Sequence, residues 1–209
     1  MASTTIDIET ELSAVNSILG AIGQSPVTQV SGNTNPEISF IYNLLRDANV
    51  DTQNEGWHFN TEKHVKYVPA TVGTKKKIAI GNDILKMDVT DGWARRQYDV
   101  VKRNGYLYDK YDHTDDWSTI TSILLDITRL LAFEDVPPVF KRYIIAKASR
   151  NAATQLVANP QLAQMLAQTE SLARAGCLEY ECNQGNHSMM GWPEGSNYST
   201  YKPWRGLRR

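Results

Sequence analysis

Hydrophobic side chains recur at helical spacing near the start of the chain. One stripe of such a helix holds Leu12, Val15, Ile18, Leu19 and Ile22. Gly23 then stands where a helix C-terminus favours a left-handed residue, and Pro26 follows where it no longer harms the helix. The stretch GAIGQSPV therefore predicts a helix end, because a phosphate-binding loop would need a Lys-Ser/Thr pair or a third glycine.

A second helical pattern begins at Asn35-Pro36-Glu37. These residues supply a cap, a proline at the first helical position and an acid at the positive end of the helix dipole. The apolar face holds Ile38, Ile41, Leu45 and Ala48, and the pattern fades before Gly56. We expect two helices within residues 9–55.

Between Trp57 and about Leu131 the apolar positions change to the period of two that is typical of strands. Gly81-Asn82-Asp83 and Asp91-Gly92 are turn signals between the short apolar pieces. Asn104-Gly105 can supply the positive φ angles that a two-residue type I′ hairpin requires. We expect an antiparallel sheet or small sandwich of about five to eight strands.

From Val136 to Asn183 the helical period returns. Pro137-Pro138 begins one helix and Asn159-Pro160 begins the next. The second of these helices is expected to bury one stripe, made of Leu162, Met165, Leu166, Leu172, Ala173, Cys177 and Tyr180.

The helix that begins at Pro137-Pro138 is apolar on more than one side. Phe140 and Ile144 lie on one side, whereas Ile145, Ala152 and Leu156 lie on another. A helix with two apolar sides is usually covered on both. We therefore expect it to pack in its own bundle and also to border a neighbouring subunit through the second set.

These patterns together predict an α+β protein. Residues 1–56 and 132–183 are expected to form a four-helix bundle-like part, and residues 57–131 an inserted β domain. Residues 184–209 have neither period and combine aromatic with basic residues, whereas a free tail is usually poor in aromatics. This composition predicts an extended C-terminal tail that becomes ordered against a partner.

The bulk composition is that of a soluble globular chain, with 41% hydrophobic and 22% charged residues among 209. No apolar run is long enough to span a bilayer, and the N-terminus lacks an export signal, so we expect a cytoplasmic location. Cys177 and Cys182 are expected to be reduced, because a spacing of five places them off a common helix face. The formal net charge of −1 argues against a globally basic nucleic-acid binder but leaves a local patch open.

Residues that could carry chemistry do not form a recognisable motif. The sequence has no G-x-S-x-G, H-E-x-x-H, paired C-x-x-C or Rossmann fingerprint. Its four histidines are scattered: His58, His64, His113 and His187. We therefore expect no catalytic site, no metal and no cofactor.

Two charged stretches leave alternatives open. Around His113 stand Asp109, Asp112, Asp115 and Asp116, which could bind a divalent cation or flank a glycosidic bond. The stretch lacks the Gly and the distal Glu of an EF-hand loop, which favours a solvated loop. The run Lys75–Lys77 could contact phosphate, but a protected sheet edge is the favoured interpretation.

Five stretches of the chain occur together in an informative order: ELSAVNSILGAIGQSPV, GWHFN, RNGYLYD, ITRLLAFEDVPPVFKRYIIAKASRNAA and ARAGCLEYE. With these stretches the sequence resembles the tail tubular protein A family of short-tailed bacteriophages, from about residue 11 to residue 182. No stretch is a catalytic signature, but the GAIGQSPV helix end, the GW-x-FN helix exit and the Pro-Pro helix start are together specific.

The resemblance implies a structural virion protein without enzymatic activity. Copies of it would form a twelvefold adaptor ring between the portal and the tail nozzle, which is tail tubular protein B, with fibres as a further partner. DNA would pass through the lumen without specific binding, and a near-neutral subunit suits such a lumen. The ring would be assembled in the host cytoplasm and function in the short tail of the virion.

Beyond Cys182 the sequence departs from the family pattern, so the contacts of the tail are argued from its composition. Aromatic and arginine side chains are common interface anchors. We expect the portal or an adjacent subunit to be contacted by Trp192, Trp204, Arg205, Arg208 and Arg209.

Two other functions remain open. A DNA-binding tail or packaging protein would act through the tail or through Lys75–Lys77. A tail-associated carbohydrate hydrolase would depend on Asp112 or Asp115.

Overall fold

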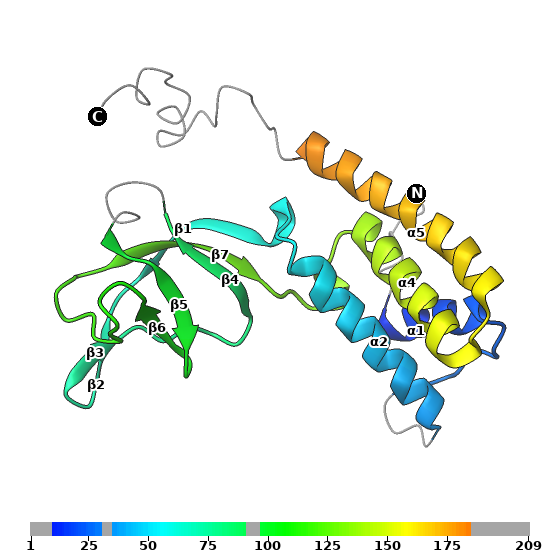
Figure 1. Cartoon of the computed structure of the whole chain (residues 1–209), viewed down its shortest axis with the longest axis horizontal. Helices are drawn as coiled ribbons and strands as arrows, with labels where there is room; N and C mark the ends of the chain where they lie inside the picture. The colour runs from blue at the N-terminus through cyan, green and yellow to red at the C-terminus, as the bar shows by residue number, and fades with distance from the viewer. Residues whose placement is uncertain (1–9, 31–34, 91–96, 185–209) are drawn as a thin grey trace, which may run out of the picture. The chain divides into compact units, whose positions relative to one another are not determined.

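The computed structural model describes residues 10–30, 35–90 and 97–184, and it confirms the α+β class (Figure 1). The chain divides into two compact units. Of the described residues, the helical unit takes in 10–30, 35–59 and 130–181, and the β unit takes in 60–90, 97–129 and 182–184. Each unit has a hydrophobic core of its own.

The helical unit begins with α1 (Glu11–Ala21), which ends as its sequence predicts. Gly23 has a φ angle of +79°, and its N–H donates back to the carbonyl of Gly20. The loop after the helix is fixed by Asn16, whose side chain accepts from the N–H of Val27 at 2.8 Å and donates to the Val27 carbonyl at 3.0 Å. The GAIGQSPV stretch is therefore a helix end, and hydrogen bonds hold the loop that follows it against the helix.

The other helices also begin where the cap residues predict. The side chain of Asn35 accepts from Glu37 N–H at the start of α2 (Pro36–Gln53). Asn159 accepts from the N–H groups of Gln161 and Leu162 at the start of α5 (Pro160–Gln184). Before α5, α4 (Pro138–Ala152) continues into a π-helical turn (Ala153–Val157).

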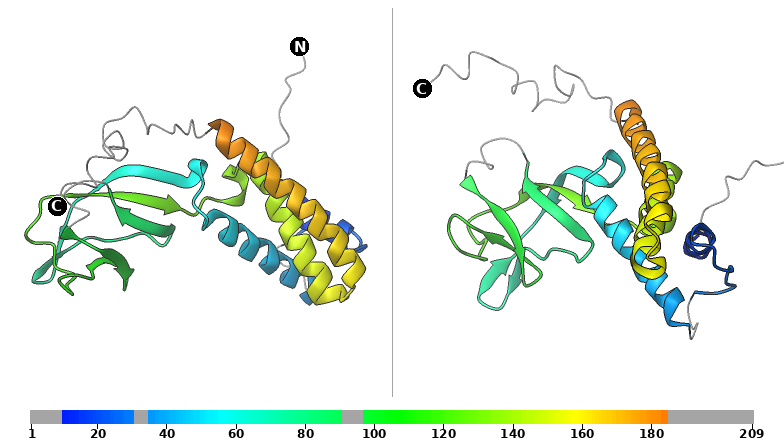
Figure 2. Two further views of the ribbon diagram at one scale, coloured as in Figure 1. Left: turned by 45° about the horizontal axis from the view of Figure 1, so that its top comes forward. Right: turned by 45° about the vertical axis from the view of Figure 1, so that its right-hand side comes forward.

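The core of the helical unit lies where α1, α2 and α4 pack on one another, and α4 lies between α2 and α5 (Figures 1 and 2). Phe140 of α4 is completely buried in it. Around this ring stand Trp57, Phe59 and Tyr180, with ring centroids 4.8, 4.7 and 5.8 Å away. Buried Gln53 exchanges two hydrogen bonds with the backbone of Leu131, at 2.7 and 3.0 Å, and so joins the end of α2 to the chain segment that leads to α4.

In its described residues the β unit contains seven strands, within the predicted number. They are β1 (Thr61–Tyr67), β2 (Ala70–Val72), β3 (Lys75–Lys77), β4 (Ile84–Val89), β5 (Val100–Arg103), β6 (Tyr106–Asp109) and β7 (Ile123–Arg129). All pairings are antiparallel, in sheets of order β1-β7-β4, β2-β3 and β5-β6.

The β5-β6 hairpin is the one that the sequence predicts. Asn104 and Gly105 both have positive φ angles, of 51° and 78°, as a two-residue turn of this kind requires. Buried Leu107 and Trp117 lie in the core of the unit, and the Trp117 indole N–H donates to the Leu107 carbonyl at 2.9 Å.

Candidate functional site

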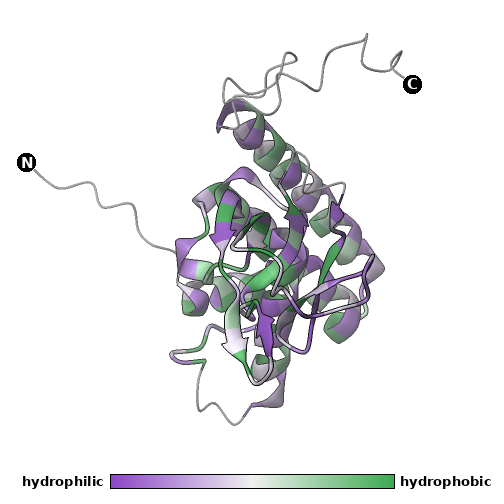
Figure 3. Cartoon of the chain, turned by 90° about the vertical axis from the view of Figure 1, so that its left-hand side faces the viewer, coloured by the Kyte–Doolittle hydropathy of each residue, from purple (hydrophilic) through white to green (hydrophobic). Residues whose placement is uncertain are grey.

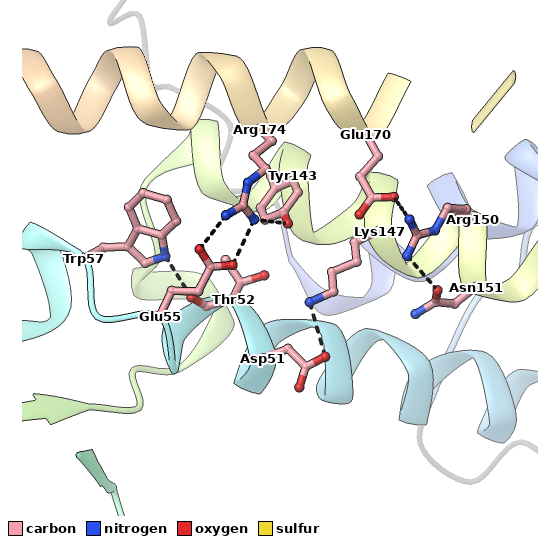
Figure 4. A network of polar contacts seen from close by, with 10 residues as sticks. All are labelled: Asp51, Thr52, Glu55, Trp57, Tyr143, Lys147, Arg150, Asn151, Glu170 and Arg174. Carbon is pink, nitrogen blue, oxygen red and sulfur yellow. Dashed lines mark hydrogen bonds and ion pairs between the residues drawn. The ribbon is translucent and has the colours of Figure 1, made fainter. Parts of the chain in front are cut away.

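A polar network of the helical unit joins α5 to α4 and to the turn that follows α2 (Figure 4). Arg174 of α5 donates to both carboxylate oxygens of Glu55, each at 3.0 Å, and to the hydroxyl of Tyr143 at 2.8 Å. Hydrogen bonds to Glu55 and then to Tyr143 raise the pKa of the Arg174 guanidinium above its ordinary value. Bidentate arginine pairs of this kind fix orientation as well as contributing energy.

Two further ion pairs cross the helices beside this network. Arg150 of α4 lies 2.8 Å from Glu170 of α5, and Lys147 of α4 lies 3.2 Å from Asp51 of α2. Exposed pairs contribute little each, but pairs that connect three helices specify how those helices align. The charged side chains of this region therefore form ion pairs within the helical unit.

The surface of α5 differs from that of the other helices. Cys177 alone is fully buried among its 25 residues, whereas α1, α2 and α4 bury several residues each. The stripe predicted for α5 is wrong at Met165 and Leu172, which are 67% and 76% exposed. These residues lie about 120° and 140° around the helix from Cys177, so they point away from the core.

Of the three residues predicted to contact a neighbouring subunit, Ile145 and Ala152 lie on α4 and Leu156 lies in the π-helical turn that follows it. Ala152 is completely buried in the helical core, so it offers no surface to another chain. Ile145 and Leu156 are partly buried and pack against the same core, so only part of each side chain is exposed. A contact with a neighbouring subunit at these two residues stays a prediction.

Two of the aspartates near His113 accept hydrogen bonds from backbone N–H groups. Buried Asp109 accepts from the N–H groups of Asp99 and Tyr111, at 3.2 and 3.0 Å. Asp116 accepts from Lys76 N–H at 3.2 Å and from Ser118 N–H at 3.1 Å.

Asp115 is paired with the lysines of β3. It contacts Lys77 and lies 3.2 Å from Lys75. Hydrogen bonds from Lys77 and then Lys75 lower the pKa of the Asp115 carboxyl below its ordinary value. The strand Lys75–Lys77 lies in a two-stranded sheet with β2, and two of its three ammonium groups face this carboxylate.

The described residues contain no group of three or more His, Cys, Asp or Glu side chains that could hold a metal ion. The backbone N–H of His58 donates to the Glu181 carboxylate at 2.9 Å, and that of His64 donates to Asp126 at 2.9 Å. His113 lies in a turn with a φ angle of 52°. His187 is outside the described residues, and no described helix is long and apolar enough to cross a membrane.

The residues predicted to anchor the tail lie outside the described part of the chain: Trp192, Trp204, Arg205, Arg208 and Arg209. Sequence reasoning missed the Glu55–Arg174–Tyr143 network. The two charged partners are 119 residues apart, and neither stands in a motif, so no local signal could have paired them.

Comparison with known proteins gives one family. The model of the family described as Tail tubular protein matches residues 12–187, which is most of the chain. No curated protein sequence matches the chain significantly.

Proposed function

Because this chain belongs to the tail tubular protein family, and is thus a structural component of a phage tail, we propose that it is one subunit of a ring-shaped adaptor. The ring would connect the portal to the tail nozzle and fibres and form part of the channel through which DNA is ejected. The family match over residues 12–187 carries this proposal.

The size of the chain supports assembly from several copies. A compact unit of about 100 residues has a radius of gyration of only about 13 Å, which is too small to form a wall around duplex DNA. A tube built from a 23.5 kDa chain therefore needs repeated copies. Copies in a closed ring meet through two different surfaces, and the rotation between neighbours has to close. The resemblance to adaptor rings favours twelve copies.

The charge of the chain is compatible with a DNA channel. Lys and Arg contacts to phosphate strengthen DNA binding through counterion release, which would hinder sliding. The formal net charge is −1, and Lys75 and Lys77 are already paired with Asp115. A lumen made by such subunits would let DNA pass without specific binding.

We place portal attachment in the tail, residues 184–209. Trp192 and Trp204 would occupy grooves of the portal or of an adjacent subunit, while Arg205, Arg208 and Arg209 would meet acidic groups. The described part of the chain retains both hydrophobic cores without this segment. A chain that ends at Asn183 should therefore fold and form contacts with its own copies but fail to bind the portal.

The experiment is electron microscopy of the protein alone and mixed with the portal ring of the same phage. We expect rings that stack on the portal for the full chain, and no stacking for the chain that ends at Asn183. Portal binding by the shortened chain would contradict the role of the tail. A full-length chain that forms no ring under either condition would contradict the adaptor function.

The alternatives make different predictions. A DNA-binding protein would show steep salt-dependent binding that is lost on changing Lys75–Lys77 or the tail. A hydrolase would lose activity on changing Asp112 or Asp115. No described feature favours either over the adaptor, because Asp115 is held by lysines and its neighbours Asp109 and Asp116 organise turns.

A further inference from the structure

The last helix, α5, buries little apolar surface against the helical unit. Of its 25 residues Cys177 alone is fully buried, whereas the shorter α1 buries four. Four more residues of α5 are partly buried against the core: Leu162, Leu166, Ala173 and Tyr180. Hydrophobic and hydrophilic residues alternate along the helix (Figure 3). Because burial of apolar surface is the main stabilising contribution in folding, the core holds α5 less firmly than it holds α1, α2 and α4.

Polar contacts attach α5 to the rest of the helical unit. We use the name α5 latch for three of them: Glu170 with Arg150, Arg174 with Glu55 and Tyr143, and Glu181 with the His58 N–H. The central pair is partly open to water, since the side chains of Arg174 and Glu55 are 44% and 34% exposed. Partly exposed polar groups can exchange a protein partner for water at a small net cost. The α5 latch therefore fixes where α5 lies and can still be released.

The chain reverses direction just before α5, at Ala158. The contacts of Arg150 with Glu170 and of Val139 with Cys177 show that α4 and α5 run antiparallel. Ala158 is exposed and has a φ angle of 51° and a ψ angle of 32°, in the left-handed region that a Cβ atom makes unfavourable. The residue needs this conformation only while α5 is folded back along α4. Strain at this position therefore favours release of α5.

We propose that α5 is a strap that opens from the helical unit as one cooperative element, with Ala158 as its pivot and the α5 latch as its lock. Opening removes Tyr180 from Phe140 and uncovers the side of α4 that carries Val139 and Tyr143. The core that α1, α2 and α4 share stays in place. This side of α4 is thus accessible only in the open state, in which local unfolding precedes global unfolding. The proposal concerns a single subunit and does not depend on the proposed ring.

The test is native-state hydrogen exchange of the full chain, measured in urea concentrations below the unfolding transition. The amides of α5 should share one degree of protection, about tenfold or more below that of the α4 amides. Their protection should also fall less steeply with urea, because opening of the strap exposes less surface than global unfolding. Equal protection and equal urea slopes in α5 and α4 would overturn the proposal. So would protection that decreases gradually towards Gln184, which is the pattern of a fraying helix end.

Arg174→Gln tests the α5 latch. The change removes both hydrogen bonds to Glu55 and the one to Tyr143, so the protection of α5 should fall about fivefold or more. Arg142→Gln is the matched control, because it makes the same change at an exposed position of α4 and should alter α5 protection less than about twofold. Unchanged α5 protection in the Arg174→Gln variant would show that these contacts do not hold the strap, and would overturn the proposal.

One substitution at two positions tests the pivot. Ala158→Gly removes the unfavourable contact of a left-handed alanine, so the closed state gains and the protection of α5 should rise several-fold. Ala175→Gly, at an exposed position inside α5, should lower this protection several-fold, because glycine is unfavourable within a helix. Opposite signs are expected from the same chemical change. A decrease, or no change, for Ala158→Gly would overturn the assignment of the pivot to Ala158.

Discussion

Replacement of Phe140 by alanine tests how the helical unit is held together. The ring is completely buried and contacts three other aromatic rings. Truncation of a buried Phe costs about 3–5 kcal/mol, because apolar contact is lost and a cavity remains. The three aromatic pairs are part of what this truncation removes, so we expect a loss in the free energy of unfolding in the upper part of that range, about 4–5 kcal/mol.

The assay is urea unfolding followed by far-UV circular dichroism, with hydrogen exchange of α4 and β7 measured in the same samples. Phe40→Ala makes the same chemical change at a partly exposed site of α2 and should cost less than about 1 kcal/mol. Phe140→Leu, which keeps much of the volume but loses the three aromatic pairs, should cost less than Phe140→Ala and should leave the helical unit folded.

Exchange protection in β7 should be unchanged by Phe140→Ala wherever the helical unit is still folded. The reason is that β7 belongs to the separate core of the β unit. A loss of less than about 1 kcal/mol, or equal losses for Phe140→Ala and Phe40→Ala, would refute the packing argument.

Two further outcomes follow from single residues. At pH 8 a maleimide should label Cys182 of the free chain and leave Cys177 unlabelled, because Cys177 is buried and burial raises the pKa of its thiol to about 11. Mass spectrometry of the peptides that hold the two cysteines measures which one is labelled. The pKa of Asp115 is lowered from its ordinary 3.8 in the folded state, so its stabilising effect is full above about pH 4 and is lost as the pH falls through the folded value. Asp115→Asn should therefore reduce the loss of stability that follows as the pH falls below about 4, measured by urea unfolding.

Much of the fold could be predicted because its signals are local. Asn35 and Asn159 cap helices with their own side chains, and Asn104-Gly105 adopts the φ angles that its turn requires. Such residues act within three positions of themselves in the chain, so the sequence alone identifies them.

The features that could not be predicted depend on distant residues. Arg174 meets Glu55, and Asp115 meets Lys75, only after the chain has folded, across 119 and 40 residues. The apolar stripe of α5 was misjudged for a different reason. At 100° per residue Met165 and Leu172 lie about 120° and 140° around the helix from Cys177, so the predicted stripe was wider than the side that α5 buries.

The central claim is that this tail protein works by assembling with copies of itself and with the portal. The mass of the purified protein, by native mass spectrometry or light scattering, alone and mixed with a portal ring, tests this claim most directly. We expect a ring of about 280 kDa for twelve copies of the 23.5 kDa chain, either alone or bound to the portal. A species of 23.5 kDa that stays monomeric in both conditions would contradict the account.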